Sequence, residues 1–543
     1  MRYQHQRFPF VRPAELDGRR CRVPVLIVGA GPVGLALAID LALHGIASVL
    51  VDDGDTVSVG SRAICWSKRT LEIFDRLGVA GRMVEKGVTW KVGRLFHGDK
   101  EVYSFDLLPE PGHKHPAFIN LQQYYVEEYL IDRAREFPDL IDLRFKTRLV
   151  GLERRPDGVT AELDTPEGRY AIAADWLVGC DGVRSTVRGL LGLDFVGRTF
   201  EERFLITDIE MKAEFPSERW FWFEPPFHDG RSALLHKQPD DIYRIDLQLS
   251  PDADPEVERK PENVKPRIEA IVGARPFEID WISVYTFQCR RLERFVHGRV
   301  IFAGDSAHIV SPFGARGGNG GIQDIDNLAW KLAAILEGDA PEALISTYDE
   351  ERVRGADENI LNSARATSFM TPKSRMESIF REEVLAMAET EAFARRLVNS
   401  GRLSLPCSLD GLSLQSDDDP AFAGAGLVPG SPCLDAPVLD SQGGETWLLE
   451  HCGGRFCVLA FGSPVEVPGG VAQLVVVPAG CGCPTSAGPC LVDAGGYVGE
   501  RYALDSGAAY LIRPDQHVAA RFRKPTREKI ASALARAQRQ ETR

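Results

Sequence analysis

Apolar and polar positions near the start of the chain predict a strand, a helix and a second strand in close succession. Residues 25–28 form a short apolar run of the kind that buried parallel strands have. Apolar residues then recur at helical spacing until Gly45, and a second apolar run follows at 48–51. This pattern predicts a βαβ unit over residues 23–53, and the polar residues within it argue against a membrane span.

The pattern changes in the middle of the chain and again near its end. Between residues 203 and 285 several short runs alternate apolar with polar residues, which predicts antiparallel strands. Residues 338–403 are charged and mostly helical in pattern, and residues 401–426 are rich in Ser, Asp, Pro and Gly, which is typical of a linker. Further strand-like runs and a final helix from about Thr526 predict a small α/β domain after the linker.

Composition and charge limit the possible partners. The chain has 543 residues, of which 44% are hydrophobic and 26% charged, and its formal net charge of −14 argues against a nucleic-acid partner. The N-terminus has no apolar core of the signal-peptide kind, so we expect a soluble cytoplasmic protein that does not associate with a membrane. The 11 cysteines are scattered, and we expect free thiols, including those of Cys481, Cys483 and Cys490.

The turn after the first strand carries three glycines at G-x-G-x-x-G spacing. Gly29 permits the tight turn, Gly31 lets the backbone approach a pyrophosphate, and Gly34 lets the helix pack closely on the strand. The helix N-terminus supplies amide donors and a positive dipole to the phosphates. Asp52 ends the second strand and is placed to accept ribose hydroxyls, so the unit predicts a dinucleotide site.

Two further strand-like runs end in a turn with a carboxylate. Asp181 and Gly182 follow one of them, and Gly304 and Asp305 follow the other. Ligands of doubly wound sheets bind at the ends of their strands, so both turns are candidates for the same site. Each aspartate alone is equally well explained as the N-cap of a helix.

Together and in this order, the three motifs resemble the single-component FAD-dependent aromatic hydroxylases, the class A flavoprotein monooxygenases. The resemblance covers roughly residues 23–371 and is clearest to the long members that act on phenols and hydroxyphenylpropionate-like acids. It implies that NADPH or NADH reduces FAD, and that the reduced flavin and O2 form a C4a-hydroperoxide. Its distal oxygen is then transferred to a phenolic aromatic substrate.

The resemblance also implies a domain order. We expect an α/β fold with a Rossmann-like FAD-binding domain, an inserted antiparallel β-sheet substrate domain and a C-terminal thioredoxin-like α/β domain. The first FAD-binding segment is expected at 1–200, the inserted sheet at 201–290, and the second FAD-binding segment with its helices at 291–400. The linker is expected at 401–426 and the thioredoxin-like domain at 427–543. The last domain lacks C-x-x-C, so we expect packing or homodimer contacts there, with no redox role.

The resemblance implies roles for residues of the cofactor site. Those expected to hold the ADP half, the diphosphate–ribityl portion and the remainder of FAD are Gly29, Gly31, Gly34, Asp52, Arg62, Gln123, Asp181, Gly182, Gly304 and Asp305. Asp181 belongs to a motif with a double role toward FAD and the nicotinamide nucleotide, and Asp305 is expected to bond the ribityl chain.

The glycine-rich stretch between residues 302 and 324 is expected to grip the flat flavin ring with bare backbone. Side chains over 317–321 would hold the ring away, and the helix expected to begin near Ile322 would point its dipole at the ring edge that becomes anionic on reduction. The residues assigned to this contact are Arg316, Gly317, Gly318 and Asn319. Pro312 and Phe313 are expected to form the wall beside the reactive face.

A phenol reacts more readily as phenolate, so a base or proton relay is expected on the inserted sheet. The candidates are His236, Arg244 and Tyr285, of which Tyr285 is preferred, with Pro312 beside the reacting atoms. His308 is expected to bond locally, and Trp220, Trp222 and Phe223 either line an aromatic pocket or belong to the core. No cluster of metal ligands is present in the sequence, and no metal is expected.

Two other functions fit parts of the sequence. Trp220 to Pro225 approaches the W-x-W-x-I-P pattern of flavin-dependent halogenases, although Glu224 stands where isoleucine belongs. A flavin-binding protein without turnover, acting through its C-terminal domain, is the other alternative.

Overall fold

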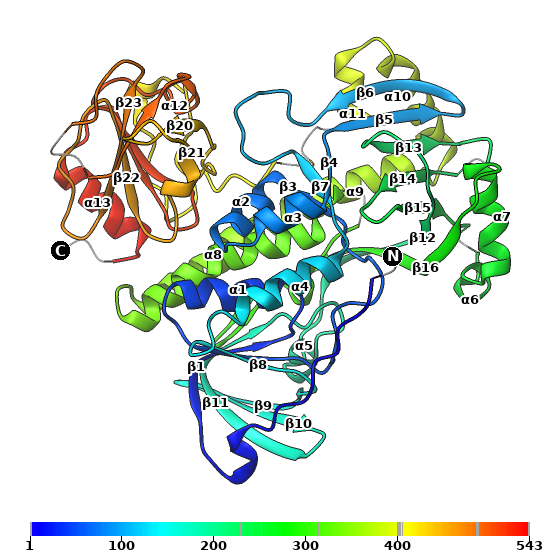
Figure 1. Cartoon of the computed structure of the whole chain (residues 1–543), viewed down its shortest axis with the longest axis horizontal. Coiled ribbons are helices and arrows are strands. Elements are labelled where there is room, and N and C mark those ends of the chain that lie inside the picture. Colours follow the sequence, from blue (N-terminus) through cyan, green and yellow to red (C-terminus); the bar gives the residue numbers. More distant parts are fainter. Residues whose placement is uncertain are drawn as a thin grey trace.

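A computed structural model gives the arrangement of the chain (Figure 1). It describes residues 3–228, 231–250, 252–311, 314–398, 403, 405–484 and 488–540. Pro312 and Phe313, which are predicted to form the wall beside the reactive face, therefore lie outside the described residues.

The first sheet is the predicted nucleotide-binding sheet. Its order is β17–β18–β11–β1–β2–β8, with β10 and β9 continuing from β11, and β1 is parallel to both β2 and β11. Helices α1, α4 and α8 lie together along one side of it (Figure 1). The bounds are β1 Arg22–Val28, α1 Pro32–Leu43, β2 Ser48–Val51, α4 Gln123–Ala134, β8 Ile141–Arg144, β9 Arg148–Arg155, β10 Gly158–Thr165, β11 Gly168–Gly179, α5 Thr186–Leu190, β17 Val296–His297, β18 Val300–Phe302 and α8 Gly317–Glu337.

The second sheet is the predicted antiparallel sheet, but it is larger than expected. Its order is β19–β16–β12–β15–β14–β13–β5–β6, so strands from residues 92–106 extend the sheet expected at 201–290. No local pattern predicts this extension, because β5 pairs with β13, which lies far away in the chain. The bounds are β5 Val92–His97, β6 Lys100–Asp106, β12 Val196–Glu210, β13 Arg219–Phe223, β14 Ala233–Lys237, β15 Ile242–Gln248, α6 Pro255–Glu258, α7 Pro261–Val272, β16 Glu278–Arg291 and β19 His308–Ile309.

A small three-stranded sheet and further helices complete the N-terminal part. The small sheet has the order β3–β7–β4. Helix α8 begins at Gly317 rather than near Ile322, so the glycines that were expected to precede it form its first turns. The bounds are β3 Cys65–Ser67, α2 Lys68–Arg76, α3 Ala80–Lys86, β4 Val88–Trp90, β7 Phe118–Asn120, α9 Ser346–Met370, α10 Arg375–Ala388 and α11 Ala392–Val398.

The C-terminal domain is a mixed sheet of seven strands in the order β21–β20–β24–β23–β22–β25–β26. The segment expected to be a linker is packed, because Leu414 and Phe422 are buried. Thioredoxin-like character of this domain stays a prediction. The bounds are β20 Pro437–Leu439, β21 Glu445–Trp447, β22 Cys457–Phe461, β23 Ala472–Pro478, β24 Cys490–Asp493, α12 Tyr497–Arg501, β25 Ala509–Ile512, β26 Val518–Phe522 and α13 Arg527–Ala537.

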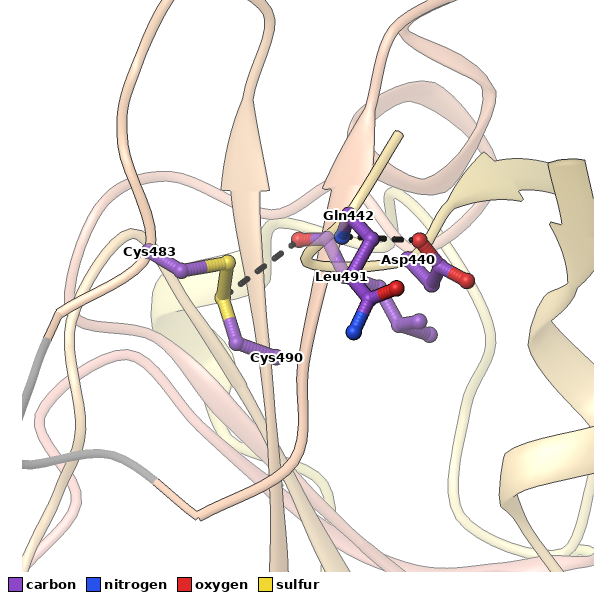
Figure 2. The surroundings of a disulfide bond; sticks show 5 residues. All are labelled: Asp440, Gln442, Cys483, Cys490 and Leu491. Carbon is purple, nitrogen blue, oxygen red and sulfur yellow. Dashed lines mark hydrogen bonds between the residues drawn. A yellow bond between two sulfur atoms is a disulfide. The ribbon is translucent and has the colours of Figure 1, made fainter. Parts of the chain in front are cut away.

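The expectation that all cysteines are free thiols is wrong for one pair. Cys483, which follows β23, and Cys490, the first residue of β24, form a disulfide with their Cα atoms 5.9 Å apart (Figure 2). Cys481 beside them is exposed and free.

Buried ion pairs join the C-terminal domain to the nucleotide-binding domain. The Arg513 guanidinium donates to both carboxylate oxygens of Glu351 on α9, at 2.5 and 2.9 Å, and Lys331 on α8 reaches the same carboxylate at 2.7 Å. All three side chains are fully buried. On the neighbouring helix α2, Arg69 donates to the Asp515 carbonyl at 2.8 Å and to Asp326 at 2.9 Å. The turn at Arg513 and Asp515 therefore ties α2, α8 and α9 to one another.

Replacing Glu351 with glutamine is expected to weaken the whole fold. The change leaves the buried Lys331 without its paired carboxylate and leaves Arg513 with Asp515 alone, which costs about 3–5 kcal/mol in the free energy of unfolding. Urea denaturation measures that loss. The matched control is Glu153→Gln, which removes an exposed pair with Arg155 and is expected to leave the unfolding midpoint unchanged. Equal midpoints for the two variants would show that the network does not stabilise the junction.

Candidate active site

The first βα turn is shaped by glycines that have no room for a side chain. Gly29 has φ +107°, and a Cβ there would lie 2.5 Å from the Cys180 carbonyl oxygen. A Cβ on Gly34 would lie 2.0 Å from the Gly29 oxygen. Gly31 differs, because a Cβ there would meet nothing within 4 Å. Gly29 and Gly34 therefore permit close packing, and Gly31 presents open backbone to a ligand.

The N-terminus of α1 opens onto the same space. Its N-cap, Gly31, offers no side-chain bond to the first-turn amides, so these amides remain available to an anion. The Asp52 carboxylate accepts from the Ala30 amide at 2.7 Å and the Gly54 amide at 2.8 Å, which fixes the turn. Burial raises the pKa of Asp52 despite these bonds.

The Asp181 turn leaves a buried acceptor without a donor. One carboxylate oxygen of Asp181 accepts from the Val187 amide at 3.0 Å, as in an N-capping turn. The other oxygen is buried and has no hydrogen-bond partner among the described residues. Burial raises the pKa of this group, and Gly182 takes the left-handed conformation, with φ +74°. A partnerless buried carboxylate oxygen is a natural contact for a ligand hydroxyl or amide.

The turn at Gly304 and Asp305 is held by Asp324 on α8. One carboxylate oxygen of Asp324 accepts from the Gly304 amide at 2.9 Å and lies 2.6 Å from His308 Nε2. Its other oxygen accepts from Arg352 Nε at 2.7 Å. His308 therefore forms a hydrogen bond with a neighbouring side chain of the protein, as expected. Asp324 was not predicted, although it stands directly after the glycine-rich stretch.

Asp305 faces an open space within the protein. Its residue is exposed to solvent, yet desolvation by the surrounding protein raises its pKa, so the carboxylate lies on the wall of a cleft. A Cβ on Gly317 would lie 4.0 Å from its Oδ1, which places Asp305 beside the N-terminus of α8. Positive charge on Arg62 lowers the pKa of Asp305, so this arginine acts across the same space.

Gln123 and Asn319 fix the segment opposite Asp305. The Gln123 amide oxygen accepts from the Ala63 amide at 3.2 Å, and its nitrogen donates to Glu127 at 2.7 Å. Asn319 accepts from the Ser67 amide at 2.9 Å and donates to the Cys65 carbonyl at 2.9 Å. Asn319 therefore holds the 63–67 backbone against α8, and Gln123 holds it against α4.

The glycines that begin α8 serve two purposes. A Cβ on Gly321 would lie 2.7 Å from Val33 of α1 and 3.1 Å from the Cα of Gly304, so this glycine permits close helix packing. A Cβ on Gly317 would meet nothing closer than 3.8 Å, so its backbone is open. Arg316 is buried before them and donates to Asn359 at 3.1 Å. The first turn of α8 has no side-chain cap.

The predicted catalytic candidates share one face of the second sheet. His236 is paired directly with Arg219 on β13 and with Arg244 on β15, and Arg244 with Asp208 on β12. Because directly paired residues point to the same side of a sheet, these four side chains form one row. Tyr285 lies on the same face, paired with Phe204.

The three candidates differ in what they are able to do. Arg244 forms a 3.2 Å ion pair with Asp208 and donates to the Arg62 carbonyl at 2.7 Å, so it anchors the Arg62 loop. Burial raises the pKa of Tyr285, with a further contribution from Asp305, so its hydroxyl stays protonated. Burial lowers the pKa of His236 well below its usual range, and its Nδ1 has no hydrogen-bond partner among the described residues.

The aromatic run at the start of the sheet is split between its two faces. Trp220 and Trp222 pack with Phe96 and with the cluster under α7, away from the row of His236. Phe221 and Phe223 point the other way and line a cavity. Trp220 and Trp222 therefore belong to the core, and these two tryptophans of the halogenase-like pattern do not face the cavity.

That cavity has a volume of about 320 Å³ and reaches the residues before α8. Its walls come from β5 and β13 of the sheet, from Gly314 and Arg316, and from α9 and α11. It is lined by Leu95, Phe105, Phe221, Phe223, Ala366, Phe369, Met370, Leu397, Val398 and Leu403, and by the polar residues Arg94, Arg219, Arg316, Asn362, Arg365 and Arg396. Among the residues that the structure describes, no acidic side chain lines it, although the whole chain is strongly acidic.

Comparison with known proteins explains why these features lie together. Residues 22–363 match a family model described as an FAD binding domain. The chain belongs to the FAD-dependent monooxygenases. It is 33% identical over 400 residues, covering 70% of this chain and 76% of the relative, to the 12-dehydrotetracycline 5-monooxygenase/anhydrotetracycline 6-monooxygenase of Streptomyces rimosus subsp. rimosus.

Two further members of this group show the range of similarity. The 3-(3-hydroxy-phenyl)propionate/3-hydroxycinnamic acid hydroxylase of Mycolicibacterium smegmatis is 29% identical over 378 residues, covering 69% of this chain and 66% of the relative. The structure of aklavinone-11 hydroxylase in a ternary complex with FAD and aklavinone matches with a TM-score of 0.77 and 25% identity. It covers 96% of this chain and 100% of that one. The resemblance stated from the sequence is confirmed.

The residues present fit FAD in this monooxygenase. The open backbone at Gly31 and the uncapped N-terminus of α1 suit the pyrophosphate, and the accessible Asp305 carboxylate suits hydroxyls of the ribityl chain. The bare backbone at Gly317 suits a flat ring beside the uncapped N-terminus of α8. Within the described residues there is no group of metal ligands and no helix able to span a membrane.

Removing the Asp305 carboxylate is expected to weaken FAD binding. Asp305→Ala loses a charge-assisted hydrogen bond of about 1.5–3 kcal/mol, which corresponds to a roughly 10- to 100-fold higher Kd. Fluorescence titration of the apoprotein with FAD measures it. Asp99→Ala, at an exposed hairpin position, is the matched control. An Asp305→Ala protein that retains stoichiometric flavin through gel filtration would refute this assignment.

Proposed function

We propose that this monooxygenase hydroxylates a phenolic aromatic compound, using O2 and either NADPH or NADH as the reductant. The observation that carries the proposal is the cavity of about 320 Å³, because it joins an aromatic wall of the second sheet to the residues that begin α8. An enclosed, mostly apolar pocket with a few polar groups is the form that sites for small aromatic molecules take.

Bound FAD supplies the chemistry of the proposal by activating O2 for transfer to the substrate. The chain's own residues bind, orient and exclude water. Phe221, Phe223 and Phe369 offer ring faces and edges to an aromatic substrate, and the row at His236 and Arg219 lies beside them. In this proposal Tyr285 orients the substrate, and Arg244 holds the Arg62 loop. Pro312 keeps its proposed place beside the reacting atoms on the basis of the resemblance alone.

The relatives support an aromatic substrate of one or several rings. Their names refer to anhydrotetracycline, 3-(3-hydroxy-phenyl)propionate and aklavinone, which range from one ring to several fused rings. The arginines that line the cavity, without a lining carboxylate, favour a substrate that carries acidic hydroxyls or a carboxylate. A homodimer also stays a proposal.

A screen of phenolic compounds tests the function directly. The FAD-loaded protein is incubated with NADPH or NADH and each compound, and nucleotide loss, O2 uptake and product mass are followed together. A product heavier by one oxygen atom is expected for at least one phenol. Nucleotide oxidation that never yields an oxygenated phenol, across single-ring and fused-ring compounds, would contradict the proposal.

Filling the cavity is expected to weaken substrate binding and to spare the cofactor. Ala366→Phe places a ring in the space lined by α9, so we expect the KM of the best phenol to rise roughly tenfold or more. The flavin content should not change. Ala270→Phe, on the exposed side of α7, is the control and should behave as the unmodified enzyme. An unchanged KM for Ala366→Phe would place the substrate elsewhere.

A further inference from the structure

One acidic side chain lies within an otherwise apolar row of the second sheet. Asp246 on β15 is paired with Leu234 on β14 and with Ile206 on β12, and Leu234 is paired in turn with Phe221. Directly paired residues share a face, so Asp246 points to the same side as Phe221, which lines the cavity. Two strand spacings, about 10 Å, separate the Asp246 and Phe221 backbones.

One oxygen of the Asp246 carboxylate, Oδ1, is buried and has no hydrogen-bond partner among the described residues. A buried acceptor in this state costs free energy that a ligand donor recovers on binding. His236, in the next row of the same face, is 4% exposed, and its Nδ1 is likewise without a partner in the described chain. Asp246 and His236 therefore each carry a buried atom without a partner on the sheet face that also carries Arg219 and Phe221, which line the cavity, although neither is among the described lining residues.

The other polar groups around Asp246 are unable to accept a proton from a substrate. Asp208 pairs with Arg244, and its oxygens also accept from Gln238 and Ser61. Arg219 and Arg244 are cations, and burial raises the pKa of the Cys65 thiol to about 11. Of the ionisable residues described around this point, Asp246 and His236 each have a buried side-chain atom without a hydrogen-bond partner.

We propose that Asp246 is a catalytic base that takes the proton of the substrate's phenolic hydroxyl, with His236 as a neighbouring hydrogen-bonding group. The proposal rests on the phenol-hydroxylating function given above. The phenolic O–H bond breaks and its proton bonds to a carboxylate oxygen of Asp246. The electron pair stays on the phenolic oxygen and is delocalised onto the ortho and para ring carbons, which makes them more nucleophilic.

The surroundings of Asp246 suit this task at neutral pH. The pKa of Asp246 is raised to about 6, because burial and the charge of Asp208 raise it by more than Arg244 and Arg219 lower it. The group is thus ionised above pH 6 and protonated below it. A base whose pKa lies near the working pH combines availability with proton affinity.

The test compares Asp246→Asn with the unmodified enzyme in single-turnover product formation across pH. With a phenol that is neutral at pH 7, the variant is expected to be roughly 100-fold slower and to recover as the pH approaches the pKa of the phenol itself. The unmodified enzyme should lose rate as the pH falls through about 6. With a nitrophenol that is already ionised, both proteins should react at similar rates.

Asp241→Asn is the matched control, because it makes the same chemical change at an exposed turn before β15. His236→Gln is expected to have a smaller effect in the same direction. If Asp246→Asn does not fold, Asp246→Ser takes its place, and flavin content and circular dichroism establish folding.

The possible outcomes separate this inference from the function on which it rests. If Asp246→Asn reacts at the rate of the unmodified enzyme and still loses rate as the pH falls through about 6, the role of Asp246 alone is overturned. An equal loss with neutral and ionised phenols also overturns it, since that pattern indicates a packing defect. If the unmodified enzyme oxygenates no phenol at all, both the function and the base are refuted.

Discussion

The whole site depends on a close approach of backbone segments that only glycine allows. Gly34 of α1 contacts the Gly29 oxygen, and Gly321 of α8 packs against Gly304 and Val33 at distances where a Cβ would clash. These contacts bring the N-termini of α1 and α8 close together. Two neighbouring helix N-termini without side-chain caps favour a long anionic cofactor with a phosphate near one end and a reducible ring near the other.

The position of α8 is fixed from both sides by buried charge. Asp324 ties the helix to the Gly304 turn and to Arg352 of α9, and farther along the helix Lys331 meets Glu351 and Arg513. Such networks contribute little net stability compared with apolar packing, but breaking one partner is costly, so they fix a single arrangement of the helices. The C-terminal domain thereby takes part in positioning α8, and no thiol chemistry is required for that role.

Local signals in the sequence predicted the nucleotide-binding half well. Glycine spacing and apolar runs located β1, α1 and β2, because the constraints there act between residues close in the chain. The start of α8 was misplaced, since weak helix propensity of glycine was outweighed by packing against Val33 and by the bonds of Asn319. Strands β5 and β6 were missed because their pairing partner is distant in sequence. Asp246 was not predicted as a site residue, because its neighbours come from paired strands and its unpartnered oxygen is not visible in the sequence.

A crystal structure of the FAD-loaded protein with a phenol bound tests the central claim most directly. The account predicts the pyrophosphate at Gly31, the flavin ring against the backbone at Gly317, and the phenolic oxygen within hydrogen-bonding distance of the Asp246 carboxylate, between the ring and the second sheet. A flavin ring bound away from the start of α8, or a phenol on the face of the sheet that carries Trp220, would contradict it.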